Sequence, residues 1–169
     1  KSEGRVAEAD DREAAIDSEA VRVVASRTVD TGDRSKTLKI TQTHHGFVMA
    51  ASGVDASDLP TGSIALLPQD PDSSARELRA AFQETVSDTS IGVVITDSAG
   101  RPWREGIIDF AIGAAGVDVL RDFRGTQDRF GQILDVTVTC VADELAAAAE
   151  LVTPKSAGSP VAVVRGLGS

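Results

Sequence analysis

An apolar run in the middle of the chain ends in a group of side chains that could bind a metal or a phosphate. Residues 91–95 are apolar, and Asp97, Ser98, Arg101 and Arg104 follow shortly after them. Carboxylate and hydroxyl oxygens bind hard divalent cations, and the planar guanidinium group suits phosphate. The simpler alternative is that Asp97 and Ser98 begin a turn or cap a helix. Both interpretations remain open on this stretch alone.

A second acidic stretch lies upstream, after a pair of histidines. Gly53 permits an unusual backbone angle, and Asp55 and Asp58 are spaced so that both can converge on one side of a turn. The alternative is an Asx-turn with a cap. His44 and His45 point to opposite faces of an extended chain, so they do not easily chelate one ion together. We interpret His45 as a ligand-binding or a turn residue, and His44 as structural or exposed.

The bulk composition restricts the class of protein. The chain has 169 residues, of which 41% are hydrophobic and 25% charged, which is typical of one globular domain. Its formal net charge of −9 argues against a nucleic-acid partner. The sequence contains neither a run of 18 apolar residues nor an apolar signal core, so we expect no membrane insertion and no secretion.

Known catalytic signatures exclude further classes. The P-loop, G-x-G-x-x-G and G-x-S-x-G patterns are absent from the sequence, and no cysteine–histidine cluster has zinc spacing. Cys140, the only cysteine, lies in an apolar run, which favours a packed thiol over a nucleophile. A cytoplasmic protein is therefore expected.

Periodicity predicts the helices and strands that position these residues. Helices are expected over residues 7–27, from residues 70–74 to Val86 with a capping box beginning at Ser74, and over residues 142–151. Strands are expected over residues 37–43, 64–67, 91–95, 133–141 and 160–166, with a polar loop over 119–131. The Gly- and Ala-rich residues 107–117 fit a dimer contact, a buried strand or a turn. The expected helices and strands do not alternate in a regular βαβ pattern. We therefore expect an α+β fold with a mixed, largely antiparallel sheet and packed helices.

Several motifs, taken in order, resemble one enzyme family. The ordered set is similar to the coenzyme F-420-0:L-glutamate ligase family, the gamma-glutamyl ligases of deazaflavin biosynthesis. The resemblance extends from Lys1 to the end of the chain. The motifs are Lys1-Ser-Glu-Gly-Arg5, His45-Gly-Phe-Val-Met-Ala-Ala-Ser-Gly-Val-Asp55, Leu66-Leu-Pro-Gln-Asp-Pro-Asp72, Thr96-Asp-Ser-Ala-Gly-Arg-Pro-Trp-Arg104, Ala111-Ile-Gly113, Arg124-Gly125, Ala142-Asp-Glu-Leu-Ala146 and Val164-Arg-Gly-Leu167.

The resemblance implies a GTP-dependent ligase. The terminal carboxylate of the coenzyme precursor would be phosphorylated to an acyl phosphate, and the amine of L-glutamate would then attack to form an amide. Two divalent cations, Mg²⁺ or Mn²⁺, would neutralise charge near the γ-phosphate, and K⁺ is a further expected ion. The resemblance also implies a gamma-glutamyl ligase-like fold and an intertwined homodimer.

The resemblance assigns roles to residues of this chain. The family's metal-binding positions fall on Asp55, Asp97 and Ser98. Its nucleotide contacts fall on Lys1, on Asp58 and on the loop over residues 152–159, within which we select Lys155, Ser156 and Gly158. Arg101 and Arg104 are candidate catalytic residues that would bind phosphate, a role inferred from their charge and position and not from the family.

Some positions depart from the family pattern. Asp58 stands where the family usually has Asn, and Pro154 and Lys155 alter a loop that usually carries Gly. The resemblance further implies sequence upstream of Lys1, so residues 1–169 are expected to form a single, incomplete ligase domain. These departures motivate two alternatives: a non-catalytic remnant of the fold, or a metal-dependent phosphohydrolase that uses the two acidic stretches.

Overall fold

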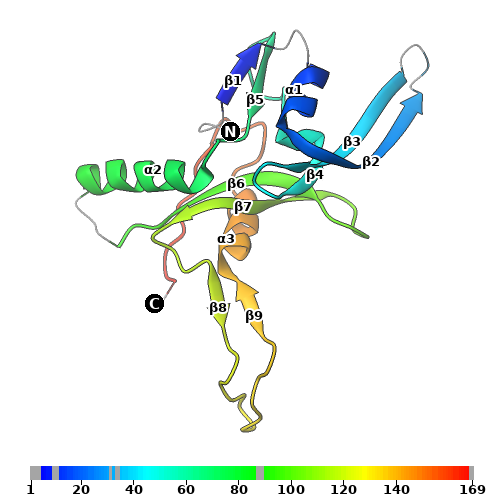
Figure 1. Ribbon diagram of the computed structural model, residues 1–169. Helices are drawn as coiled ribbons and strands as arrows, with labels where there is room; N and C mark the ends of the chain where they lie inside the picture. The colour runs from blue at the N-terminus through cyan, green and yellow to red at the C-terminus, as the bar shows by residue number, and fades with distance from the viewer. Residues whose placement is uncertain (1–4, 9–11, 31, 33–34, 87–89, 168–169) are drawn as a thin grey trace. The chain divides into compact units, whose positions relative to one another are not determined.

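A computed structural model describes residues 5–8, 12–30, 32, 35–86 and 90–167 (Figure 1). The chain divides into two compact units, one holding the residues up to Gln69 together with Ala99–Ile107, the other holding Asp70–Ser98 and Ile108–Ser169. The expectation of a single domain stays a prediction. The elements in chain order are β1 (Arg5–Glu8), α1 (Arg12–Glu19), β2 (Ala20–Asp30), β3 (Ser35–Thr43), β4 (Val48–Ala50), a 3₁₀ turn (Ala51–Gly53), β5 (Ser63–Leu66), α2 (Pro71–Val86), β6 (Val93–Gly100), β7 (Ile107–Ala115), β8 (Leu120–Asp122), β9 (Val138–Cys140) and α3 (Val141–Glu150).

The α+β class is confirmed, because helices accompany small antiparallel sheets. In the first unit β1 pairs antiparallel with β5, and β3 lies between β2 and β4 with both neighbours antiparallel. In the second unit β8 pairs antiparallel with β9, and β6 pairs with β7. The expected helices over residues 70–86 and 142–151 and the expected strands over 37–43 and 64–67 are all present.

The predicted helix over residues 7–27 is confirmed only over Arg12–Glu19 and is wrong over the rest of the described span. This segment forms β1, the short helix α1 and the long strand β2. Beyond Glu19 the residues are rich in valine, including Val21, Val23 and Val24. Because β-branched side chains favour strands, and because β2 pairs with β3 along its whole length, tertiary pairing replaces the helix that the spacing of Ile16 and its neighbours indicated.

A buried polar pair joins three elements in the core of the first unit. Ile16, Val54 and Ile64 form its apolar cluster. Beside them the Ser52 hydroxyl donates to the carbonyl of Ile16 at 2.8 Å. The Thr41 hydroxyl oxygen lies 2.9 Å from the Ser52 hydroxyl oxygen. The Ser52 backbone N–H also donates to Thr41 Oγ1 at 2.9 Å. These bonds satisfy two hydroxyls that are almost completely buried.

The capping residue of helix α2 lies four residues before the start of the predicted capping box. Asp70 Oδ1 accepts the backbone N–H of Ser73 at 2.8 Å, so Asp70 and not Ser74 caps the helix. Pro71 then takes the first helical position, where its missing N–H is harmless. Ala75 is buried against Ile95. The buried face of the helix ends early, because Phe82 and Val86 are exposed.

Carboxylates of two helices bind backbone N–H groups of β7 within the second unit. The pairs are Ala114 with Asp72 Oδ1 at 2.8 Å, Ala111 with Asp143 Oδ1 at 2.9 Å, and Asp109 with Glu150 Oε2 at 2.9 Å. Helices α2 and α3 are thereby attached to β7, and three backbone donors of the strand have acceptors.

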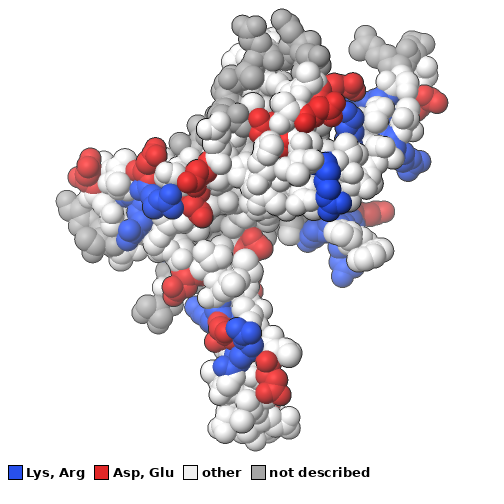
Figure 2. Space-filling view, viewed as in Figure 1, with Lys and Arg blue, Asp and Glu red and all other residues white. Residues whose placement is uncertain are grey.

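Strands β8 and β9 form the base of a long arm in the second unit (Figure 1). The predicted strand over residues 133–141 is present only at Val138–Cys140. Farther out, Asp128 organises a turn by accepting the N–H groups of Phe130 and Gln132. Acidic and basic side chains alternate along the arm (Figure 2). We call residues 119–140 the arm.

The predicted strand over residues 160–166 is also wrong. The structure describes these residues, and they have no strand pairing. Val161 and Val163 are exposed, so the alternating apolar pattern finds no neighbouring strand. No helix in the described part of the chain is long and apolar enough to cross a membrane.

Candidate functional site

Asp97 and Ser98 lie inside a strand. The predicted strand end at residue 95 is therefore wrong, and so is the alternative that the two residues begin a turn or cap a helix. Strand β6 begins at Val93 and continues to Gly100 because β7 pairs with it. Both residues are half-buried. Since successive side chains of a strand point to opposite faces, Asp97 shares a face with Ile95, whereas Ser98 shares the other with Thr96. A single ion would not easily contact both side chains.

A carboxylate that sequence analysis missed lies beside Ser98. Asp109 Oδ1 accepts the Ser98 hydroxyl at 2.8 Å, and Asp109 Oδ2 accepts the Thr96 hydroxyl at 3.0 Å. Asp109 lies in β7, the strand that pairs with β6. The available signal was an acidic residue within the apolar stretch 107–117. Its partner could not be identified because the register of the two strands was unknown.

Asp55 and Asp58 occupy a turn of the first unit. Asp55 Oδ1 accepts both the backbone N–H and the hydroxyl of Ser57 at 2.8 Å, which is the Asx-turn that was the simpler alternative. The backbone of Asp55 bridges to Ala65. Asp58 is exposed and has a φ of 55°, a left-handed conformation that Asn and Asp tolerate best. Asp58 therefore occupies a backbone conformation that suits Asp as well as Asn.

The β6–β7 hairpin ends in an exposed, basic tip. Arg101 and Arg104 are exposed, and Trp103 between them is 95% exposed with a φ of 55°. Arg104 donates from Nη1 to the carbonyl of Trp103 at 3.2 Å. Among the described residues, neither arginine forms an ion pair with a carboxylate within 4.0 Å. Both guanidinium groups are accessible to an anion.

The remaining predicted nucleotide contacts lie at the end of the chain or outside the described residues. Lys155, Ser156 and Gly158 are exposed in the loop after α3, where Ala157 N–H donates to the Pro154 carbonyl at 2.9 Å. Gly158 has a positive φ of 60°. Lys1 lies outside the described residues, so its role stays a prediction.

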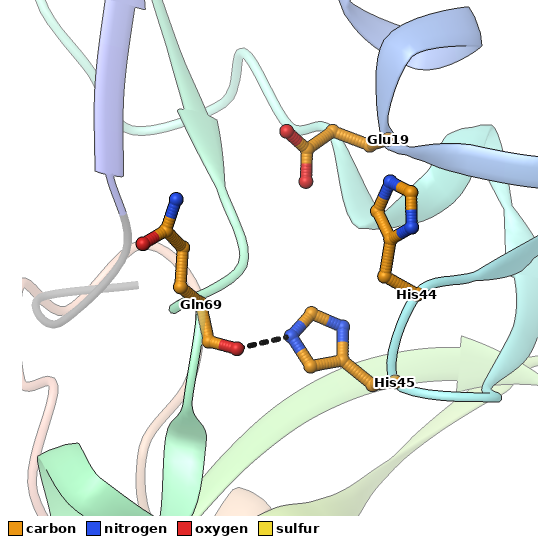
Figure 3. A pocket seen from close by; sticks show the side chains of 4 residues that line it. All are labelled: Glu19, His44, His45 and Gln69. Carbon is orange, nitrogen blue, oxygen red and sulfur yellow. Dashed lines mark hydrogen bonds between the residues drawn. The ribbon is translucent and has the colours of Figure 1, made fainter.

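A small polar hollow lies within the first unit, beside His45, which sequence analysis interpreted as a ligand-binding or a turn residue. It has a volume of about 270 Å³ and is lined by Glu19, His44, His45 and Gln69 (Figure 3). His45 Nε2 donates to the carbonyls of Pro68 at 2.8 Å and Gln69 at 3.2 Å.

The histidine contacts favour structural roles. His44 is exposed, and its Nε2 donates to the Ser18 carbonyl at 3.2 Å, as the expected structural or exposed role requires. His45 holds the segment after β5 to the β3–β4 turn, so its contacts favour the turn alternative.

The donor set on the hairpin fits a hard divalent cation better than zinc. Thr96, Asp97, Ser98 and Asp109 offer only oxygen atoms, as Mg²⁺ and Mn²⁺ prefer. Within the described ranges no group of three or more His, Cys, Asp or Glu residues is arranged to hold a metal ion. A site here would thus rely on hydroxyl, water or substrate oxygens in addition to carboxylates.

Comparison with known proteins gives consistent matches. The model of the F420-0:Gamma-glutamyl ligase family matches residues 2–166. The chain is 49% identical over 129 residues to a coenzyme F420:L-glutamate ligase of Methanopyrus kandleri, covering 76% of this chain and 51% of the relative. It is 40% identical over 151 residues to that of Methanocaldococcus jannaschii, covering 89% and 60%.

A third relative extends the pattern. A coenzyme F420:L-glutamate ligase of Archaeoglobus fulgidus is 46% identical over 123 residues, covering 72% of this chain and 49% of the relative. The matched segments thus span about half the length of these curated relatives. Because the family model covers nearly the whole chain, the chain belongs to the F420-0:gamma-glutamyl ligase family.

Proposed function

We propose that this chain carries part or all of a GTP-dependent ligase that adds L-glutamate to the precursor of coenzyme F420. The observation that carries the proposal is the family match over residues 2–166, supported by relatives with 40–49% identity that are named coenzyme F420:L-glutamate ligases. The oxygen donors of the β6–β7 hairpin are compatible with it. A cytoplasmic location is part of the same proposal.

The proposed reaction has two displacements. A carboxylate oxygen of the precursor attacks the γ-phosphorus of GTP, and GDP leaves, which gives an acyl phosphate. The amine of L-glutamate then attacks the acyl carbon, loses a proton and expels inorganic phosphate. The first cycle gives an amide of the precursor's own carboxylate. Later cycles extend the tail through γ-carboxylates, so each later product is a γ-glutamyl amide. The acyl phosphate is needed because a free carboxylate is a poor electrophile.

In this proposal the metal ions and the phosphate groups are bound by different residues. Asp55, Asp97 and Ser98 hold two Mg²⁺ or Mn²⁺ ions, with Asp97 and Ser98 serving different ions because they face opposite ways. The ions supply charge neutralisation at the triphosphate. Arg101 and Arg104 bind phosphate oxygens from the exposed hairpin tip.

The nucleotide would be held by a second set of residues. This set is Lys1, Asp58, Lys155, Ser156 and Gly158. The exposure of the loop after α3 leaves Lys155 and Ser156 accessible to a ligand. K⁺ is a further ion that we propose for this site.

We further propose that the protein is a homodimer. Apolar side chains are exposed on the β2–β3 ribbon, including Val21 at 57% and Leu38 at 50%. On the arm Phe130 is 73% and Ile133 60% exposed. Apolar groups exposed in such numbers mark interaction surfaces, and a second copy of the chain would cover them.

One observation favours the non-catalytic alternative. The Asp55 carboxylate is bound by Ser57, so it has a structural role without any metal. One assay and one binding measurement separate the three possibilities. GTP, Mn²⁺, the precursor and L-glutamate are incubated with the protein, and GDP, inorganic phosphate and the tail length are measured. Nucleotide binding is measured separately over a range of metal concentrations.

The ligase predicts glutamate-dependent GDP release with a longer tail. Phosphate release without glutamate would support a phosphohydrolase. Absence of nucleotide binding at every metal concentration would support a remnant and overturn the proposed function.

A further inference from the structure

Asp109 is the centre of a hydrogen-bonded chain that crosses the second unit. Its two carboxylate oxygens accept one hydroxyl each, from Ser98 at 2.8 Å and from Thr96 at 3.0 Å. Its backbone N–H donates to Glu150 Oε2 at 2.9 Å, which connects β7 to the last residue of α3. Three elements therefore fix the position of this carboxylate relative to β6.

The carboxylate determines the direction of the Ser98 hydroxyl hydrogen. An ionised carboxylate can only accept hydrogen bonds, so Ser98 must donate to it. A serine hydroxyl has one hydrogen and two lone pairs. Once the hydrogen is directed at Asp109, both lone pairs point elsewhere, and Ser98 offers only acceptor character to a ligand. Donation to a carboxylate also increases the electron density on Oγ, as in the outer shell of metal sites.

We propose that Asp109 is a positioning residue that orients Ser98 Oγ toward a hard divalent cation, an inference that rests on the metal role given to Ser98 in the proposed function. In this proposal Asp109 acts through Ser98 and not as a ligand of the ion. Each of its carboxylate oxygens accepts one hydroxyl, and these two bonds hold the carboxylate in place. Glu150 supports the arrangement by holding the Asp109 backbone. Thr96 occupies the other oxygen and prevents the carboxylate from turning.

A purely structural role for Asp109 makes a different prediction. If the carboxylate only stabilised the hairpin, its removal would lower the thermal midpoint of the metal-free protein and leave the affinity for the ion unchanged. If it positions Ser98, its removal weakens ion binding, and that effect depends on the presence of the serine hydroxyl. A double-mutant cycle distinguishes the two roles.

The experiment is a Mn²⁺ titration followed by electron paramagnetic resonance of the free ion. It is carried out on the wild-type protein, Asp109→Asn, Ser98→Ala and the double variant. We expect Asp109→Asn to weaken Mn²⁺ binding at the Ser98 site by roughly 10- to 100-fold, the usual effect of losing an outer-shell partner. In the Ser98→Ala background the same change should cause no further loss.

Control variants separate charge and packing from positioning. Asp118→Asn removes one negative charge from an exposed loop of the same unit and should leave Mn²⁺ affinity unchanged. Thr96→Val removes the other hydroxyl bound to Asp109 and should have a smaller effect than Asp109→Asn. Asp109→Glu keeps the charge and lengthens the side chain, so an intermediate affinity is expected even if Asp109→Asn folds poorly.

The outcomes are distinguishable. Unchanged Mn²⁺ affinity in Asp109→Asn, or equal losses with and without the Ser98 hydroxyl, overturns the positioning role while the proposed function stands. If the wild-type protein and Ser98→Ala bind Mn²⁺ equally, the metal role of Ser98 in the proposed function fails, and the positioning role fails with it. Loss in Asp109→Asn that disappears in the Ser98→Ala background supports the inference.

Discussion

Asp97 and Ser98 are neighbours in sequence but face opposite sides of β6. Their chemistry could be predicted from residue type, because acids and hydroxyls suit hard cations. Their surroundings could not: the partner of Ser98 is Asp109, which is distant in sequence and reaches it only through the pairing of two strands. The Asx-turn of Asp55 with Ser57 is local, and sequence analysis did anticipate it as an alternative.

Replacing Asp97 with Ala tests the proposed metal site directly. We expect a loss of at least tenfold in Mn²⁺-dependent GTP binding, equivalent to about 1.4 kcal/mol, because a carboxylate ligand is removed. The far-UV circular dichroism spectrum should be retained, since Asp97 is only half-buried. Asp118→Ala is the matched control. Isothermal titration calorimetry at fixed Mn²⁺ measures the effect, and an unchanged affinity would remove Asp97 from the site.

Cys140 should be a poor nucleophile at neutral pH. Burial raises the pKa of the thiol above its usual value of 9.0, so the neutral form persists to higher pH than in the unfolded chain. The stability contribution of this shift is fully present below the unfolded pKa and is lost as the pH rises through the folded pKa. Modification by Ellman's reagent at pH 8 should be slower in the native than in the denatured protein. Equal rates would contradict the burial of the thiol.

The helices and strands differ in how far sequence predicts them. Helices α2 and α3 and strands β3 and β5 follow local periodicity, and their positions were predicted correctly. The segment over residues 7–27 was not, because β2 exists through pairing with β3. Likewise residues 160–166 have a strand pattern without a partner. The local sequence pattern predicted an element correctly where that element buries an apolar face of its own. It failed where pairing with a strand distant in sequence determines whether a strand forms.

Gly113 tests the close packing of β7 against the start of α2. A Cβ at this position would lie 2.4 Å from the carbonyl carbon and oxygen of Pro71. We expect Gly113→Ala to lower the free energy of unfolding by about 1–3 kcal/mol, the usual cost of overpacking. Gly100→Ala in β6 is the control, because nothing lies within 4 Å of its Cβ, and a change under about 0.5 kcal/mol is expected. Urea denaturation followed by far-UV circular dichroism measures both variants.

The cap of α2 gives a second test at this scale. Asp70 Oδ1 accepts the Ser73 N–H at 2.8 Å, so Asp70→Ala should destabilise the protein by about 1 kcal/mol. Ser74→Ala changes the residue that sequence analysis placed at the cap and should cost less. The free energy of unfolding is measured by chemical denaturation. If Ser74→Ala lowers it more than Asp70→Ala does, Ser74 and not Asp70 is the capping residue.

For the whole molecule, the exposed apolar groups support the proposed association of two copies. Many large apolar side chains remain exposed in both units, on the ribbon of β2 and β3 and along the arm. In the sequence, the family resemblance implied a homodimer and the Gly- and Ala-rich residues 107–117 offered one possible contact. Exposure of a valine or phenylalanine cannot be recognised without the fold. The exposed residues identify which surfaces a partner copy would cover.

The protein should therefore have about twice the mass of the 17.5 kDa chain in solution. Replacing Phe130 and Ile133 of the arm with Asp should shift it toward the monomer, since burying unpaired carboxylates is costly. Val161→Asp, in the C-terminal segment outside both surfaces, should leave the mass unchanged. Size-exclusion chromatography with light scattering measures the mass, and a monomeric wild-type protein would contradict the proposed assembly.

Trp103 has a consequence for optical spectroscopy. It is the only tryptophan in a chain without tyrosine, and it is 95% exposed at the hairpin tip. Its emission should already be red-shifted in the native protein, so tryptophan fluorescence should change little when the core unfolds. The same fluorophore lies between the two arginines proposed to bind phosphate, so quenching by GTP would report contact at the tip against an almost silent background.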